Sequence, residues 1–262
     1  MDMTTKMLLT IKIGSNILTD SRNQLDLNVL RHLIQQIAFL KQKGLMIVVV
    51  TSGAIVCGSA ALGINPESLE DKQASAAVGQ VILMEHYQLF FEKLGFKVGQ
   101  VLLTKDGLLD QTRAKLAKNT FNRLLELDVI PIVNENDTVS VDEIKFSDND
   151  TLSSMVSILL GADLQIFLTD IDGVYNADPR TDKEAKLISR FRDIPETLRS
   201  QMSAESVSQK GRGGMKSKVT SAQLLLENNI ESIIAPGKRE NVLLDLYRGQ
   251  IIGTFCLKGD LS

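Results

Sequence analysis

Several residue types that mark particular protein classes are scarce in this sequence of 262 residues, which has no tryptophan, two histidines and five prolines. Its two cysteines, Cys57 and Cys256, lie far apart without metal-ligand spacing, which indicates a reducing compartment. Two histidines do not suffice for a multi-histidine metal site. Few prolines and only 18 glycines exclude collagen-like and proline-rich chains.

Long apolar runs and an excess of one charge are also missing. No apolar run approaches the ~18 residues that a membrane span needs, and residues 1–4 lack the charged-then-apolar profile of a signal peptide. Lys plus Arg number 29 against 32 Asp plus Glu, a formal charge of -3, so no basic field favours nucleic acid. We therefore expect a cytoplasmic protein that binds any anion through local groups.

The chain instead alternates between short strand-like apolar runs and longer segments with helical periodicity. This alternation predicts the α/β class, a three-layer αβα sandwich around a mostly parallel open sheet, in one domain over residues 1–262. The expected strands cover residues 8–13, 45–50, 98–103, 129–133, 164–168, 232–235 and 251–257. The expected helices cover residues 27–43, 72–94, 112–127 and 151–160.

Polar and glycine-rich clusters follow four of the expected strands, at residues 12–15, 51–54, 134–137 and 169–170. In open parallel sheets, ligands bind outside the carboxyl ends of the strands. Loops are often polar without being functional, but four clusters at one sheet edge indicate one site.

Two lysine-bearing segments favour phosphate chemistry. Residues 211–218, GRGGMKSK, combine glycines with an expected helix start, which suits an anion, although a solvated surface loop would have the same composition. Lys12 ends an apolar strand, where a charge calls for an anionic partner. Two lysines at one crevice suit phosphoryl transfer. The chain has no P-loop pattern and no G-x-G-x-x-G after a strand.

A helix starting near Met215 would place its two lysines differently. Apolar residues recur on one face of that helix, with Lys218 beside them and Lys216 turned toward solvent. A cation in the first helical turn is unfavourable unless an anion compensates it, so we expect Lys218 to meet a phosphate.

Carboxylates and amides gather at residues 134–137, NEND, and 147–151, SDNDT. They suit either a metal or a zwitterionic ligand, and spacing does not decide between these. Residues 148–151 also fit ordinary helix capping. No serine nucleophile elbow occurs, and we interpret Cys57 as a packed thiol and His86 as structural or solvated.

The order of these motifs resembles the glutamate 5-kinase family of the amino acid kinase superfamily over essentially the whole chain. Besides the clusters above, the resemblance rests on the segments 77–80, AVGQ, and 177–180, ADPR. The NEND and DND pair is specific to this family. Asn16, Ser147 and Ser217 depart from its usual pattern, and the chain resembles the short form without the C-terminal PUA domain.

The resemblance implies transfer of the γ-phosphate of ATP to the γ-carboxylate of L-glutamate, the first step of proline biosynthesis. By position, Lys12 and Lys218 would act on the transferring phosphoryl group and Asp150 would hold these lysines in place. Glutamate would be bound by Ser52, Asp137 and Asn149. The nucleotide, with Mg²⁺ on its phosphates, would be bound by Lys12, Thr169, Asp170, Arg212, Gly213, Gly214, Met215, Lys216, Ser217 and Lys218.

The resemblance also implies a homo-oligomer, either dimer or tetramer, and feedback inhibition by proline. Two alternatives stay open from the sequence. One is another kinase of the superfamily, such as an acetylglutamate kinase. The other is a regulator that binds a nucleotide or an amino acid without catalysis.

Overall fold

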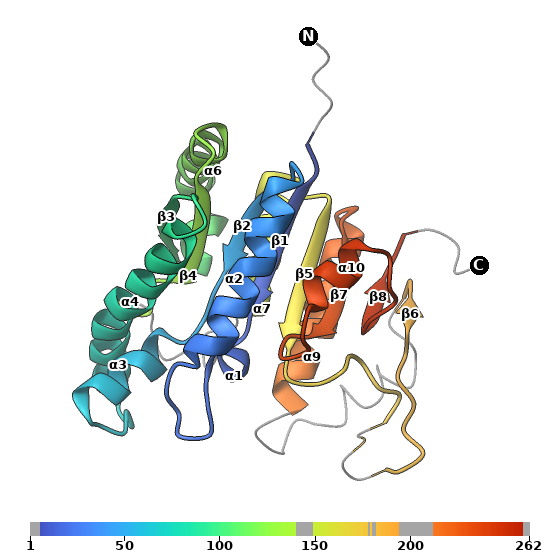
Figure 1. Cartoon of the computed structure of the whole chain (residues 1–262), viewed down its shortest axis with the longest axis horizontal. Coiled ribbons are helices and arrows are strands. Elements are labelled where there is room, and N and C mark those ends of the chain that lie inside the picture. The colour runs from blue at the N-terminus through green and yellow to red at the C-terminus, as the bar shows by residue number, and fades with distance from the viewer. Residues whose placement is uncertain (1–5, 140–148, 178, 180–181, 194–211, 259–262) are drawn as a thin grey trace.

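A computed structural model describes residues 6–139, 149–177, 179, 182–193 and 212–258 (Figure 1). Within these residues a single sheet of eight strands runs in the order β3-β4-β2-β1-β5-β7-β8-β6. All neighbours in the sheet are parallel except β7 and β8, which pair antiparallel. The strands are β1 Leu8–Ile13, β2 Met46–Val50, β3 Val98–Leu103, β4 Ile130–Glu135, β5 Leu164–Thr169, β6 Arg190–Phe191, β7 Glu231–Pro236 and β8 Thr254–Cys256.

Helices cover both faces of this sheet. One layer contains α1 Ser15–Leu18, α2 Leu27–Gln42, α3 Ala54–Leu62, α4 Leu69–Glu92 and α10 Val242–Tyr247. The other contains α5 Lys105–Leu109, α6 Gln111–Glu126, α7 Asn149–Leu160 and α9 Arg212–Glu227. The predicted three-layer α/β sandwich with a mostly parallel sheet is therefore confirmed.

Successive side chains of a strand point alternately to the two helical layers. In β1, Leu9 and Ile11 join the core beneath α2 and α4, whereas Leu8 joins the core beneath α6 and α7. Lys12 has the same parity as Leu8, so it lies on the α7 face of the sheet. This alternation decides which helix Lys12 meets.

Most element boundaries agree with the periodicity to within a few residues. The last strand is shorter than predicted, since it is expected over residues 251–257 and observed over Thr254–Cys256. Gly253 causes it, because its φ of +84° breaks the extended backbone. A side chain there would come within 2.0 Å of the Ile234 carbonyl oxygen. The helix expected to start near Met215 begins at Arg212.

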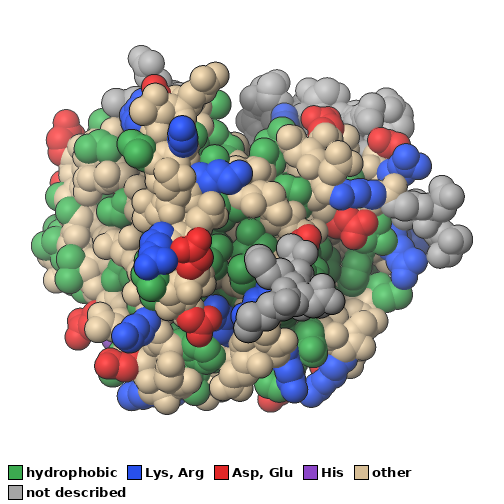
Figure 2. All heavy atoms as spheres, turned by 90° about the horizontal axis from the view of Figure 1, so that it is seen from above, with side chains coloured by type: hydrophobic (Ala, Val, Ile, Leu, Met, Phe, Trp, Pro, Cys, Tyr) green, Lys and Arg blue, Asp and Glu red, His purple; other side chains and the backbone are tan. Residues whose placement is uncertain are grey.

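The surface carries charges of both signs. On the face shown in Figure 2, Lys and Arg side chains are interspersed with Asp and Glu. This agrees with the near-neutral balance of the sequence and shows no basic stripe on that face. None of the helices in the described ranges is long and apolar enough to cross a membrane.

Candidate active site

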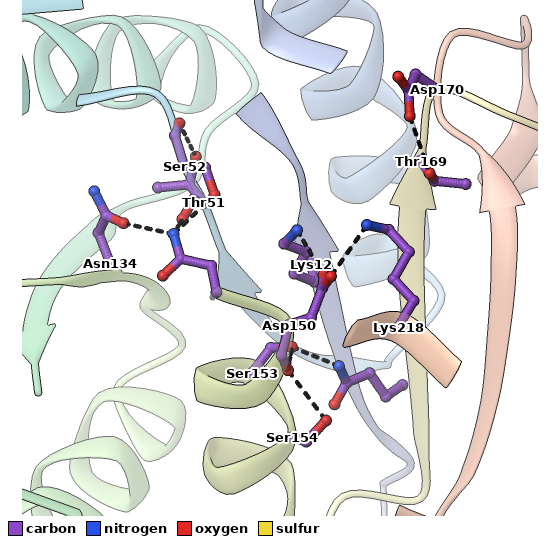
Figure 3. A network of polar contacts seen from close by, with 12 residues as sticks. Lys12, Thr51, Ser52, Asn134, Asp150, Ser153, Ser154, Thr169, Asp170 and Lys218 are labelled. Atoms are coloured by element: carbon purple, nitrogen blue, oxygen red, sulfur yellow. Dashed lines mark hydrogen bonds and ion pairs between the residues drawn. The ribbon is translucent and has the colours of Figure 1, made fainter. Parts of the chain in front are cut away.

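The four polar clusters follow β1, β2, β4 and β5, which are consecutive neighbours in the sheet in the order β4-β2-β1-β5. Because these strands are parallel, their carboxyl ends lie together at one edge, the lower edge in Figure 1. The first turn of α7 and the side chain of Lys218 from α9 reach the same place (Figure 3). The structure thus brings the predicted clusters to one site.

At the centre of this edge, one carboxylate lies between two ammonium groups. Asp150 Oδ1 is 2.6 Å from Lys12 Nζ, and Asp150 Oδ2 is 3.0 Å from Lys218 Nζ (Figure 3). All three residues are at least nine-tenths buried. The arrangement holds two ammonium groups about one carboxylate in a place shielded from water.

Local structure fixes the carboxylate of this cluster. Asp150 lies in the first turn of α7, where the helix dipole favours an acidic side chain. Its backbone carbonyl accepts hydrogen bonds from the hydroxyls of Ser153 and Ser154. Both lysines therefore meet a group that the start of α7 holds in place.

The two lysines of α9 differ as the helical register predicts. Lys218 is buried beside Val219 and Ala222 of the core, whereas Lys216 is exposed. Met215 and Ser217 are half-buried. Arg212, Gly213 and Gly214 belong to the helix, but their surroundings lie outside the described part of the structure. Ser147 and Asp148, which precede α7, also lie outside it.

On the other side of the cluster, the amide of Asn149 connects two strand ends. Its Nδ2 donates to the Thr51 carbonyl and to Ser52 Oγ, both at 2.8 Å, and to Asn134 Oδ1 at 3.1 Å (Figure 3). Asn134 Oδ1 also accepts from the backbone N–H of Glu135 at 2.9 Å. One buried amide at the start of α7 therefore connects the residues that follow β2 with Asn134 of β4.

These contacts determine which atoms donate and which accept. The Thr51 carbonyl can only accept, so Asn149 must turn its NH₂ group toward it and keep its oxygen on the other side. That Asn149 Oδ1 is buried and accepts no hydrogen bond from the described residues. Ser52 Oγ accepts from Asn149 and so has its own proton to donate. The site offers an amino acid ligand both a donor and an acceptor.

Two carboxylates, Glu135 and Asp137, lie at the end of β4. Burial, together with the nearby carboxylate of Glu135, raises the pKa of Asp137 to about 6. An ammonium group would relieve the cost of ionising Asp137 there, because an opposite charge favours the ionised form. Asp137, Asn149 and Ser52 together suit a ligand with both an ammonium and a carboxylate.

On the far side of the lysines, the end of β5 provides two further polar groups. Thr169 is buried, and its hydroxyl donates to Asp170 Oδ1 at 3.2 Å. Asp170 Oδ2 accepts from Asn16 Nδ2 at 3.0 Å, a contact the sequence did not suggest. Asn16 stands at a departure from the family pattern, and its amide connects α1 to the β5 end.

Two more residues of the site carried no predicted role. Asn134 belongs to the NEND motif and Gln80 to the AVGQ segment. Asn134 Nδ2 donates to Gln80 Oε1 at 2.8 Å. A buried amide in a strand is costly unless its hydrogen bonds are made, and that cost was the available signal for Asn134.

The described residues contain no group of three or more His, Cys, Asp or Glu side chains arranged to hold a metal ion. The central carboxylate, Asp150, is already paired with lysines. Mg²⁺ dehydrates reluctantly and is commonly held by substrate phosphates with few protein ligands. A magnesium ion that is carried by a nucleotide would need few ligands from these residues.

A family model and several known proteins match this chain. The model of the amino acid kinase family matches residues 7–236. The chain belongs to the amino acid kinase family. A UMP kinase from Ureaplasma parvum has a similar fold, with a TM-score of 0.64 at 15% identity, covering 97% of this chain and 99% of that one. An isopentenyl phosphate kinase superposes with a TM-score of 0.63 at 17% identity, covering 95% and 100%.

Within the amino acid kinase family, the similar curated relatives are called glutamate 5-kinases. The chain is 46% identical to that of Syntrophus aciditrophicus over 94% of its own length, and it spans 64% of that relative. It is 42% identical to that of Clostridium tetani, covering 94% of this chain and 93% of the relative. The resemblance drawn from the motifs is confirmed by these relatives.

Proposed function

We propose that this chain transfers the γ-phosphate of ATP to the γ-carboxylate of L-glutamate, giving γ-glutamyl phosphate and ADP in the first step of proline biosynthesis. The observation that carries the proposal is the position of the lysine cluster between two parts of the site. One part is a half-site for the amino acid, and the other is a half-site for the nucleotide. Asn149, next to Asp150 in the chain, serves an amino acid half-site, and Thr169 lies at the neighbouring strand end. The names of the relatives support the same activity.

In this proposal, the amino acid half-site recognises both charged groups at the α-carbon of glutamate. Asp137 and Asn149 Oδ1 would accept from its ammonium group, and the Ser52 hydroxyl would donate to its carboxylate. The ammonium and the carboxylate of glutamate each need a partner in the site, because burial penalises a charge without one. A substrate without a free amino group would leave Asp137 unpaired.

The lysine cluster would stabilise the phosphoryl group during transfer. Lys12 and Lys218 supply two positive charges, and Asp150 holds them at a fixed separation before the substrates arrive. Charges fixed in advance stabilise the transition state without reorganisation at the moment of reaction. The attacking carboxylate is already ionised at pH 7, so the step needs no general base.

The nucleotide would lie over the β5 end, against Thr169, Asp170 and the first turns of α9. Lys12 and the residues Arg212, Gly213, Gly214, Met215, Lys216, Ser217 and Lys218 would contribute to its binding. Mg²⁺ bound with ATP would neutralise phosphate charge and orient the transferring group. Lys12 and Lys218 would bind and position the phosphates through their ammonium groups.

Other parts of the expectation remain predictions. These are inhibition by proline, assembly into a dimer or tetramer, a cytoplasmic location and a single domain over residues 1–262. Proline carries the same ammonium and carboxylate groups that Asp137 and Ser52 are proposed to bind. We therefore expect proline, if it inhibits, to compete with glutamate for these groups.

The proposal is tested by incubating the purified chain with ATP, Mg²⁺, L-glutamate and hydroxylamine, which traps an acyl phosphate as the hydroxamate. We expect γ-glutamyl hydroxamate to form in step with ADP. The Lys218→Ala variant serves as the inactive control. ADP release without hydroxamate, or hydroxamate formation that is equal in the control, would disprove glutamate phosphorylation by this site.

A further inference from the structure

The segment AVGQ at residues 77–80 belongs to the family pattern. It lies in the middle of α4, where that helix crosses α3. A Cβ on Gly79 would lie 1.8 Å from the Ala54 carbonyl oxygen and 2.4 Å from the Gly58 nitrogen. The two helices therefore meet backbone to backbone, which only glycine permits. This close crossing brings the next residue, Gln80, against the end of β4.

Gln80 is the partner of Asn134 on the side away from Asn149. Its Oε1 accepts the hydrogen bond from Asn134 Nδ2 at 2.8 Å. Asn134 is 1% exposed, so water does not replace this partner easily. A buried amide that loses its acceptor costs roughly 1–3 kcal/mol.

Asn134 is unable to escape that cost by turning its amide over. Its Oδ1 accepts from the Glu135 N–H and from Asn149 Nδ2, both of which only donate. A reversed amide would set NH₂ against both donors. The Oε1 atom of Gln80 therefore fixes the orientation of the Asn134 amide. The Oδ1 atom of Asn134 in turn accepts from Asn149 and helps to hold it in place.

A second residue of α4 supports the same unit from the β2 side. Tyr87 lies seven positions after Gln80, two helical turns along the same face. Its hydroxyl lies 2.8 Å from Thr51 Oγ1, and both residues are fully buried. The carbonyl of Thr51 is the one that accepts from Asn149. Helix α4 thus contacts both strand ends that Asn149 connects.

We propose that Gln80 is a positioning residue for glutamate, which acts through Asn134 to hold the Asn149 amide in its binding orientation. This inference rests on the proposed function, because it concerns the amino acid half-site. Gln80 affects the half-site for glutamate and not the nucleotide side, since its side-chain hydrogen bond within the described residues is to Asn134 of β4.

The test compares Gln80→Met with Gln88→Met, an exposed glutamine on the same helix. We expect Gln80→Met to raise KM for glutamate at least tenfold and to leave KM for ATP within twofold. Gln88→Met should change neither constant by more than twofold. Gln80→Ala, which removes the acceptor without placing an apolar group beside Asn134, should repeat the result if Gln80→Met is not recovered folded.

A double mutant separates positioning from general damage. In the Asn134→Ala background, Gln80→Met should raise KM for glutamate by less than twofold further, because its partner is gone. Independent, multiplicative effects would overturn the inference, as would equal increases in both Michaelis constants. A wild-type chain that makes no hydroxamate would instead refute the proposed function, whereas normal wild-type turnover with an unchanged Gln80→Met refutes only the role of Gln80.

Discussion

Lys12 and Asp150 form a buried contact between the end of β1 and the start of α7, with 2.6 Å between Nζ and Oδ1. Both side chains are less than a tenth exposed. Asp150 pairs at the same time with Lys218, so each lysine depends on a carboxylate that it shares. The pairing fixes two positive charges where the proposed phosphoryl group passes.

Lys12→Ala should lower kcat at least ~100-fold, about 2.7 kcal/mol of transition-state stabilisation. Asp150 would keep Lys218 as a partner, so the buried carboxylate stays compensated and the melting temperature should change little. Steady-state kinetics and a thermal melt on the same preparation check both. A variant that keeps its rate but melts much earlier would show that Lys12 is structural.

The two lysines of α9 allow a matched comparison between two alanine variants. Lys218→Ala removes a buried cation beside Asp150 and should reduce kcat/KM at least ~100-fold. Lys216→Ala removes an exposed cation and should reduce kcat/KM less than ~10-fold. Comparable losses in the two variants, or a larger loss at Lys216, would contradict the proposed roles.

Asp150→Asn removes the negative charge between the two ammonium groups. Breaking a buried pair in this way costs about 3–5 kcal/mol, which for a chain of this size lowers the melting temperature by roughly 5 °C or more. Inorganic phosphate or ATP should restore more of that loss in the variant than it adds to the wild type, because an anion replaces the carboxylate. Equal anion effects in both proteins would argue against a phosphate at the lysines.

The ionisation of Asp137 predicts a pH dependence for glutamate. With a pKa near 6 in the free protein, Asp137 is mostly protonated at pH 5 and mostly ionised at pH 7. Because the ammonium group needs the ionised form, KM for glutamate should fall about tenfold as pH rises from 5 to 7. Initial rates across this range, with KM for ATP measured in parallel, check the direction.

Asp137→Asn is the control for that profile. It should raise KM for glutamate at pH 7 by one or more orders of magnitude, since a hydrogen bond to a charged group is worth ~1.5–3 kcal/mol. It should also abolish the dependence of KM on pH between 5 and 7. Equal damage to the constants for glutamate and ATP would point to a metal or scaffold role for Asp137.

Much of this fold follows from local patterns in the sequence. Apolar runs such as residues 8–13 and 98–103 mark strands exactly, and the alternation of strands with helices predicts parallel pairing. Gly253 shows the limit of such reasoning. Its left-handed backbone and its approach to the Ile234 carbonyl depend on how β8 lies against β7, which no local pattern contains.

The candidate site was also predictable only in part from the sequence. Lys12, Asp150 and Lys218 come from distant parts of the chain. Strand-end position and helical register predict that the two lysines converge, whereas the place of Asp150 beside them was implied by the family resemblance. Gln80 was not predictable, because its contact with Asn134 depends on the close crossing of α3 and α4 at Gly79. Strand order, which sets the four clusters side by side, also required the structure.

The most direct measurement is the ratio of kcat/KM for L-glutamate to that for N-acetyl-L-glutamate, with ATP and Mg²⁺ and the acyl phosphate trapped as hydroxamate. The two substrates present the same attacking carboxylate and differ at the ammonium group that Asp137 and Asn149 are proposed to bind. We predict a ratio of at least ~100, because the acetylated ligand leaves the partly buried carboxylate of Asp137 unpaired. A ratio near or below one would contradict the proposal that this site phosphorylates glutamate.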